Sequence, residues 1–153
     1  MSFSNLSGIY QYDTTYDNHK EKALESAKKA IDILQNKNNK LGQAAATNNL
    51  GNIYLLNGNF KQSKKTYLEG IRLIKGDTSM KAIKRRGGLY YNLSMAMRNL
   101  NDYRAYEYLD TARIMKSQVR DLETKEKLER VTAEFNVSMV RKEGKLQKKE
   151  AEN

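Results

Sequence analysis

The chain has 153 residues, the length of one domain, and its 39% hydrophobic and 30% charged residues are typical of a soluble protein. It contains no cysteine, which excludes disulfides, thiolate metal ligands and a cysteine nucleophile. The net charge of +10 makes the surface attractive to acidic partners and repulsive to basic ones.

The same pattern of small, amide and aromatic residues occurs three times along the chain. It reads "SNLSGIYQYDTTY" over residues 4–16, "NNLGNIYLLNGNF" over 48–60 and "YNLSMAMRNLNDY" over 91–103. The second copy follows the first by 44 positions and precedes the third by 43. The chain also lacks proline, which would interrupt a helix at a cost of about 3 kcal/mol. Together these features predict an all-α repeat protein.

Each copy precedes a stretch whose small and apolar residues recur at steps of four and three, a spacing that keeps them on one helix face. These residues are Ala23, Ala27 and Ala30, then Ser63, Tyr67 and Gly70, then Ala105, Leu109 and Ala112. Between the two helices of each unit, turns are predicted at Asp17-Asn18, Gly58-Asn59 and Asn101-Asp102. We therefore expect three helical hairpins, over about residues 3–38, 40–76 and 78–117.

The segment "NNLGNIYLLNGNFKQSKKTYLEGIRL" resembles the tetratricopeptide repeat (TPR), whose units carry Asn-Leu-Gly, Tyr and Gly-x-aromatic at these spacings. The resemblance covers about residues 4–117. It implies a right-handed α-solenoid whose first helices line a concave groove. Because the usual unit has 34 residues, the longer spacing implies extended helices.

The segment 121–153 matches no repeat, but Leu128, Val131, Phe135 and Met139 recur at helical spacing before a basic end from Arg141 to Lys149. We expect a separate seventh helix here. It either caps the apolar face of the last repeat, as solenoids require, or forms a coiled-coil stalk.

No combination of residues indicates catalysis. The single histidine, His19, has no nucleophile or metal ligand beside it in sequence, and no phosphate-binding loop or metal-ligand spacing occurs. We expect a protein that is not an enzyme and needs no cofactor or metal.

The candidate site lies on the first helices of the second and third units. In the second unit, steps of four and three place Asn48, Asn52 and Leu55 on one face. A carboxamide such as that of Asn52 can bind a peptide backbone through both its donor and its acceptor. Alternatively, Asn49 and Asn92 only hydrogen-bond between helices.

In the third unit, the stretch Thr78–Asn101 contains five basic residues, Lys81, Lys84, Arg85, Arg86 and Arg98, and no acid. Tyr91, Met95 and Arg98 follow the groove-facing steps. The set Lys84, Arg85, Tyr91, Met95 and Arg98 would form either a positive, partly aromatic groove for an acidic peptide or a solvated basic face. Gly87-Gly88 marks a kink, a late helix start or the close approach of another backbone.

These features predict a protein–protein or peptide interaction module that binds an acidic or partly apolar segment. The long units and charged tail resemble TPR regions of bacterial sensor kinases or helix-turn-helix regulators, which implies a signalling role. The alternative is a nucleic-acid-binding protein that uses residues 78–101 and the basic tail.

No apolar run reaches the roughly 20 residues of a membrane helix, and no secretory signal is visible. We therefore expect no membrane contact and a cytoplasmic location, or a periplasmic one if the chain belongs to a membrane sensor.

Overall fold

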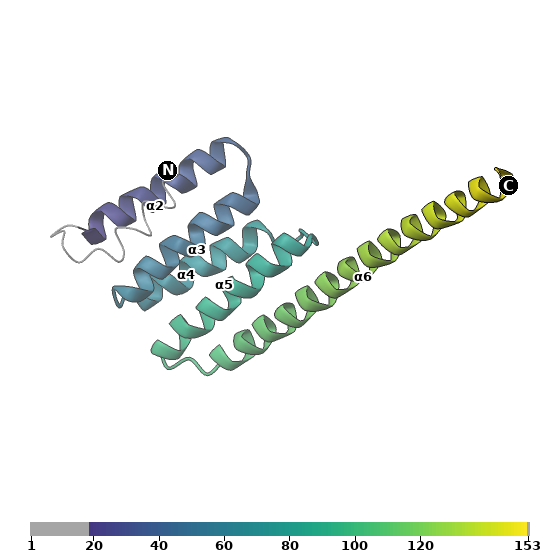
Figure 1. Cartoon of the computed structure of the whole chain (residues 1–153). Coiled ribbons are helices and arrows are strands. Elements are labelled where there is room, and N and C mark those ends of the chain that lie inside the picture. The colour runs from purple at the N-terminus through teal and green to yellow at the C-terminus, as the bar shows by residue number, and fades with distance from the viewer. Residues whose placement is uncertain (1–18, 153) are drawn as a thin grey trace. The chain divides into compact units, whose positions relative to one another are not determined.

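A computed structural model of the chain describes residues 19–152, so the first helix of the first unit and the Asp17-Asn18 turn lie outside the described residues. The described residues form α-helices and no strand, which confirms the all-α prediction (Figure 1). The helices are α2 (His19–Asn36), α3 (Lys40–Leu56), α4 (Phe60–Leu73), α5 (Met80–Asn99) and α6 (Ala105–Ala151).

Short polar turns separate the helices at the positions that the sequence predicts. Gly58 adopts φ +75° after α3, and Asn101 adopts φ +55° after α5, a left-handed conformation that glycine and asparagine tolerate. Helix α3 begins after Asn39, whose side chain accepts a hydrogen bond from the Gly42 N–H at 2.8 Å. Helix α5 begins after Ser79, which accepts one from the Ala82 N–H at 3.3 Å. These caps satisfy N–H groups that the first turn of a helix leaves unpaired.

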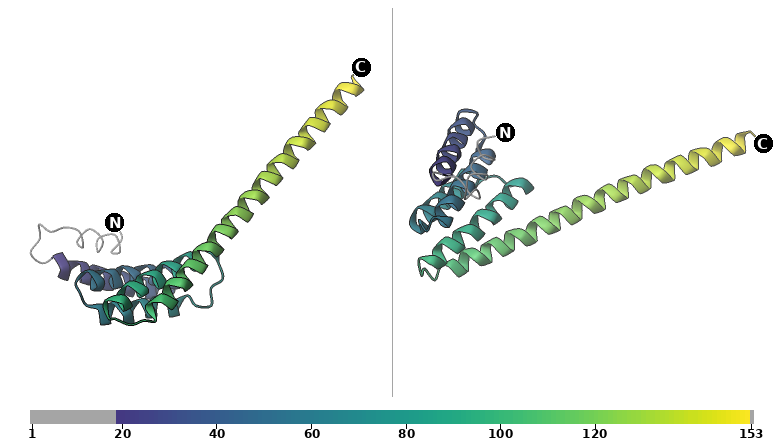
Figure 2. Two further views of the ribbon diagram at one scale, coloured as in Figure 1. Left: turned by 90° about the horizontal axis from the view of Figure 1, so that it is seen from below. Right: turned by 60° about the vertical axis from the view of Figure 1, so that its left-hand side comes forward.

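Helix α3 contacts α2, α4 and α5, and α4 also contacts α5, so these helices lie side by side (Figures 1 and 2). The core between them contains the fully buried Tyr67, Leu89, Leu93 and Met97. The small residues that the sequence places on one face of the second helices are also buried, which permits close packing. They are Ala23, Ala27, Ala30, Ser63 and Gly70.

Helix α6 has 47 residues and passes through the boundary between two compact units, one ending at Ser117 and the other starting at Gln118. The prediction of a separate seventh helix is therefore wrong, because residues 121–151 continue the helix that begins at Ala105. The physical reason is that the sequence from Ser117 to Leu128 has neither glycine nor proline to end a helix. All residues from Arg120 to Glu152 are exposed.

The Gly87-Gly88 pair lies inside α5 and does not delay its start, so the late-start alternative is wrong. A Cβ on Gly87 would lie 3.4 Å from Cβ of Met115 and 3.8 Å from the carbonyl oxygen of Ala112, both in the first part of α6. Among residues 19–152, no atom beyond the adjoining helix backbone lies within 4 Å of a Cβ placed on Gly88. Both Gly87 distances are ordinary van der Waals contacts, so within residues 19–152 no close approach of another backbone requires a glycine at either position. Nearby, the Tyr90 and Tyr108 rings stack with centroids 5.8 Å apart, which also joins α5 to α6.

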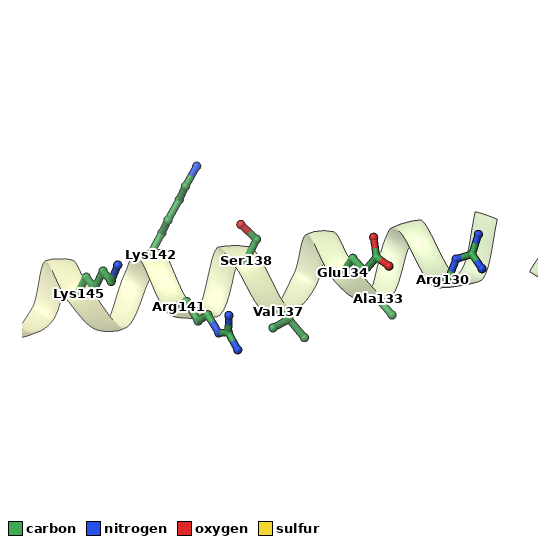
Figure 3. Close-up of a pocket in the computed structure, with 8 residues that line it drawn as sticks. All are labelled: Arg130, Ala133, Glu134, Val137, Ser138, Arg141, Lys142 and Lys145. Carbon is green, nitrogen blue, oxygen red and sulfur yellow. The ribbon is translucent and has the colours of Figure 1, made fainter. Parts of the chain in front are cut away.

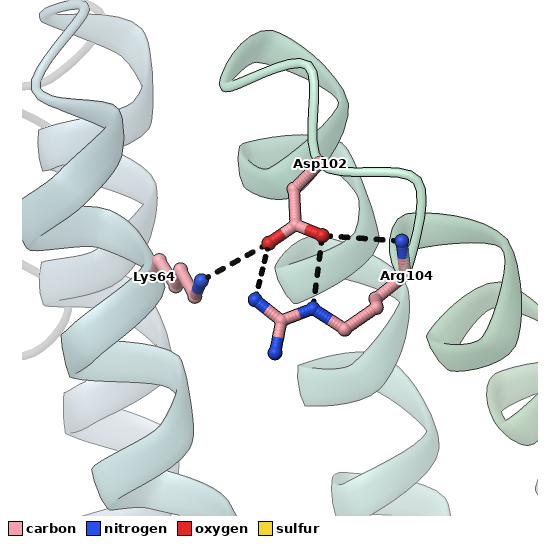
Figure 4. A network of polar contacts seen from close by, with 3 residues as sticks. All are labelled: Lys64, Asp102 and Arg104. Atoms are coloured by element: carbon pink, nitrogen blue, oxygen red, sulfur yellow. Dashed lines mark hydrogen bonds and ion pairs between the residues drawn. The ribbon is translucent and has the colours of Figure 1, made fainter.

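An ionic network fixes the turn between α5 and α6 (Figure 4). The Arg104 guanidinium donates to both carboxylate oxygens of Asp102, at 3.0 and 2.7 Å, and the Lys64 ammonium of α4 lies 3.3 Å away. The hydrogen bonds from Arg104 hold the pKa of Asp102 well below its ordinary value of 3.8, and Lys64 adds to this effect. The Asp102 side chain is only 15% exposed, so the network ties the turn to α4.

Replacing Gly51 with alanine should lower the free energy of unfolding by about 1–3 kcal/mol, the usual cost of overpacking a core. The new Cβ would lie 2.7 Å from Cδ1 and 2.9 Å from Cζ of the buried Tyr67 ring. The matched control, Gly88→Ala, places its methyl group in open space and should stabilise α5 by up to about 1 kcal/mol. Urea unfolding followed by circular dichroism measures both; equal effects would contradict this packing.

Replacing Asp102 with asparagine should destabilise the protein at neutral pH. Because the pKa of Asp102 is lowered by folding, its contribution is present above a pH of about 4 and is lost as the pH falls toward the folded-state pKa. The difference in unfolding free energy between wild type and variant should therefore shrink on acidification. Asp110→Asn, which removes an exposed pair with Arg113, is the control and should change little.

Candidate functional site

A groove of about 260 Å³ lies between α3 and α5. Its lining comes from the first half of each helix. The residues are Leu41 and Asn48 of α3 and Lys81, Lys84, Arg85 and Gly88 of α5. The structure thus brings together Asn48, Lys84 and Arg85, three of the residues predicted for the partner-binding groove.

The groove is positively charged along one wall. Lys81, Lys84 and Arg85 are exposed, and none of them forms an ion pair or hydrogen bond with another residue in 19–152. Among residues 19–152, no acidic side chain lines the groove. Leu41, which is half-buried and packs against the core, adds an apolar contact surface on the α3 wall of the groove. Such a combination favours a ligand with carboxylates next to an aliphatic side chain.

The neighbouring asparagines hydrogen-bond between helices. The Asn92 amide of α5 donates to the Oδ1 atoms of Asn48 and Asn52, at 2.9 and 3.2 Å. The Tyr67 hydroxyl of α4 donates to the same Asn52 oxygen at 2.6 Å. The Asn52 oxygen therefore already accepts two hydrogen bonds and is not available for a peptide backbone, so the alternative of inter-helix hydrogen bonding is confirmed for Asn92 and applies to Asn52 as well.

Tyr67 is the buried member of this network. Its ring is fully buried, and this burial raises the pKa of its hydroxyl to about 12, with the neighbouring Ser63 side chain acting in the opposite direction. The Ser63 hydroxyl donates to the Gly51 carbonyl at 2.9 Å. These contacts fix the distance between α3 and α4 and position Asn52 for Asn92.

The remaining predicted residues lie outside the groove. Leu55 is half-buried and packs against the core, which gives it a structural role. Tyr91 is 51% exposed, Arg98 is exposed and Met95 is half-buried. These three occupy the second half of α5, whereas the groove involves the first half.

Three groove residues were not among those predicted for the site: Leu41, Lys81 and Gly88. Lys81 lies in the basic stretch that the sequence indicated. Leu41 lies seven residues before Asn48, and continuing the steps of four and three toward the start of the helix would have found it. Arg86, in contrast, belongs to the predicted basic stretch but is occupied: its guanidinium donates to the Ile74 and Asp77 carbonyls. It secures the turn between α4 and α5, so it should not be counted among the binding residues.

Two other depressions are lined by residues of a single helix. One, on α6, is lined by side chains from Arg130 to Lys145 (Figure 3). The other, on α4, is lined by side chains from Lys61 to Arg72. Both are open to one side, because a single helix supplies only one wall. Of these three depressions in residues 19–152, only the groove between α3 and α5 is lined by two helices.

Within the described part of the chain, no three histidine, aspartate or glutamate side chains converge to hold a metal ion. None of the helices in residues 19–152 combines the length and apolarity required to cross a bilayer. Comparison of the sequence and structure with protein-family models, curated proteins and solved structures found no match.

Replacing Tyr67 with phenylalanine should lower the free energy of unfolding by about 1 kcal/mol near pH 8, the usual value of one hydrogen bond. Because folding raises the pKa of Tyr67, the hydroxyl's contribution is complete below pH 10 and decreases as the pH rises toward 12. The difference between the two proteins should therefore shrink in alkali. Tyr91→Phe, at a 51% exposed position, is the control and should match wild type at every pH in urea unfolding.

Proposed function

We propose that the chain is a TPR-like, non-enzymatic interaction module whose groove between α3 and α5 binds an acidic, partly apolar segment of a partner protein. The observation that carries the proposal is the lining of the groove: three cations without ion-pair partners in residues 19–152, one leucine and no acid. The TPR assignment is supported by the repeated sequence pattern and by helices that pack in chain order with short turns.

The chemistry of the lining favours a peptide over a small anion. A peptide can place a carboxylate near Lys84 and Arg85 while an aliphatic side chain covers Leu41, so one ligand satisfies both halves of the groove. The Asn48–Asn92 hydrogen bond holds the two walls together, which reduces the ordering cost of binding. The resemblance of the long units and charged tail to bacterial sensory TPR regions supports a signalling or regulatory role.

A second candidate function is nucleic-acid binding, which the net charge of +10 and the basic end of the tail favour. Such binding uses phosphate contacts spread over the surface and loses affinity steeply with salt. Groove recognition instead depends on a few defined cations and one apolar contact. The two functions therefore predict different responses to salt and to the position of a charge reversal.

The test compares two double charge reversals on the full chain. Lys84→Glu with Arg85→Glu changes the groove, whereas Lys61→Glu with Lys65→Glu makes the same change in charge on exposed positions of α4. The probe is a fluorescent peptide of alternating glutamate and leucine, measured by anisotropy, with labelled single- and double-stranded DNA in parallel.

We expect the groove variant to weaken peptide binding by about tenfold or more, and the α4 variant by less than about threefold. Raising salt from about 50 to about 200 mM should weaken peptide binding only modestly, because the leucine contact does not depend on salt. Equal losses in both variants would contradict a specific groove. Tight DNA binding that falls by about a thousandfold or more over that salt range would favour the second function instead.

A further inference from the structure

The second half of α6 exposes large apolar side chains on one face. Leu128, Val131, Phe135, Met139 and Leu146 are between 40% and 65% exposed. At 3.6 residues per turn they form one stripe, with Val131 at its edge. An exposed apolar stripe of this length, interrupted only by Lys142, marks an interaction surface.

The spacing of the stripe is symmetric. Leu128, Phe135, Met139 and Leu146 are separated by seven, four and seven residues, so the pattern reads the same in both directions about position 137. Two antiparallel copies centred there would place Leu128 against Leu146 of the second copy and Phe135 against Met139. A parallel, in-register pair would instead place Lys142, which follows the same spacing, against its own copy.

The charges favour the same orientation. Residues 122–136 contain three basic and four acidic side chains, whereas residues 138–152 contain five basic and three acidic ones. Antiparallel pairing brings the acidic half of one helix beside the basic half of the other. Parallel pairing brings the two basic halves together, which costs free energy.

From the symmetric stripe and the charge difference, we propose that residues 122–152 of α6 pair antiparallel with the same segment of a second copy of the chain. The self-complementary spacing is what selects a second copy as the partner, because the same surface serves both sides of a two-fold interface. This inference does not depend on the groove between α3 and α5.

The first experiment measures the mass of the full chain by sedimentation equilibrium between about 1 µM and about 1 mM. We expect a monomer–dimer equilibrium that Phe135→Asp weakens by about tenfold or more. Val137→Asp is the matched control, because Val137 is 52% exposed but lies on the opposite side of the helix. A monomer throughout, or equal effects of the two substitutions, would overturn the proposal.

The second experiment determines the orientation, and the lack of native cysteine makes it specific. Leu128→Cys and Leu146→Cys chains are oxidised separately and as a mixture. A disulfide needs Cβ atoms about 4 Å apart, so the antiparallel dimer should crosslink one variant to the other in the mixture. Each variant crosslinked to itself with no mixed product would show a parallel pair and overturn the proposal.

Both experiments are repeated on the chain with Lys84→Glu and Arg85→Glu. Dimerisation should be unchanged, because these residues lie in the other compact unit. Failure of the groove proposal and failure of the dimer proposal are thus observed separately.

Discussion

The packing of the Tyr67 ring against the backbone of Gly51 is the contact on which the arrangement of α3, α4 and α5 depends. The ring occupies the space that any side chain at position 51 would need, and its hydroxyl reaches Asn52, one residue further along α3. Asn52 in turn accepts from Asn92 of α5. The buried Tyr67 therefore positions three helices. Its ring packs α4 against α3, and its hydroxyl holds Asn52, which accepts the hydrogen bond from α5.

The groove follows from this arrangement. The Asn48–Asn92 hydrogen bond joins α3 to α5 beside the groove, and the first turns of α5 carry the cations that line it. Arg86, in the same basic stretch, binds carbonyl groups of the turn before α5. One cation of the helix therefore stabilises the fold, whereas Lys81, Lys84 and Arg85 line the groove. Because the groove is built on two packed helices and not on a loop, helix packing fixes its shape.

Helix α6 combines two kinds of surface in one element. Its first residues belong to the packed unit, where Ala105 and Ala112 are buried and Tyr108 stacks on Tyr90. From Arg120 onward every residue is exposed, and the apolar stripe has no partner within its own unit. An uninterrupted helix of this kind has little to stabilise it beyond local propensity, so association through the stripe would add stability that the isolated segment lacks.

The sequence by itself determined the helical class, the turns at Gly58 and Asn101 and the basic character of α5, because these depend on local propensity and spacing. The repeat pattern also placed small residues on one face of each second helix, and those in α2 and α4 are buried. Only the tertiary structure decided which polar groups are occupied: the Asn48–Asn92 bond joins residues 44 apart, and Arg86 serves a turn and not the groove. Leu41 likewise lines the groove because α3 packs beside α5. Such pairings depend on the angle and distance between packed helices, which no local pattern encodes.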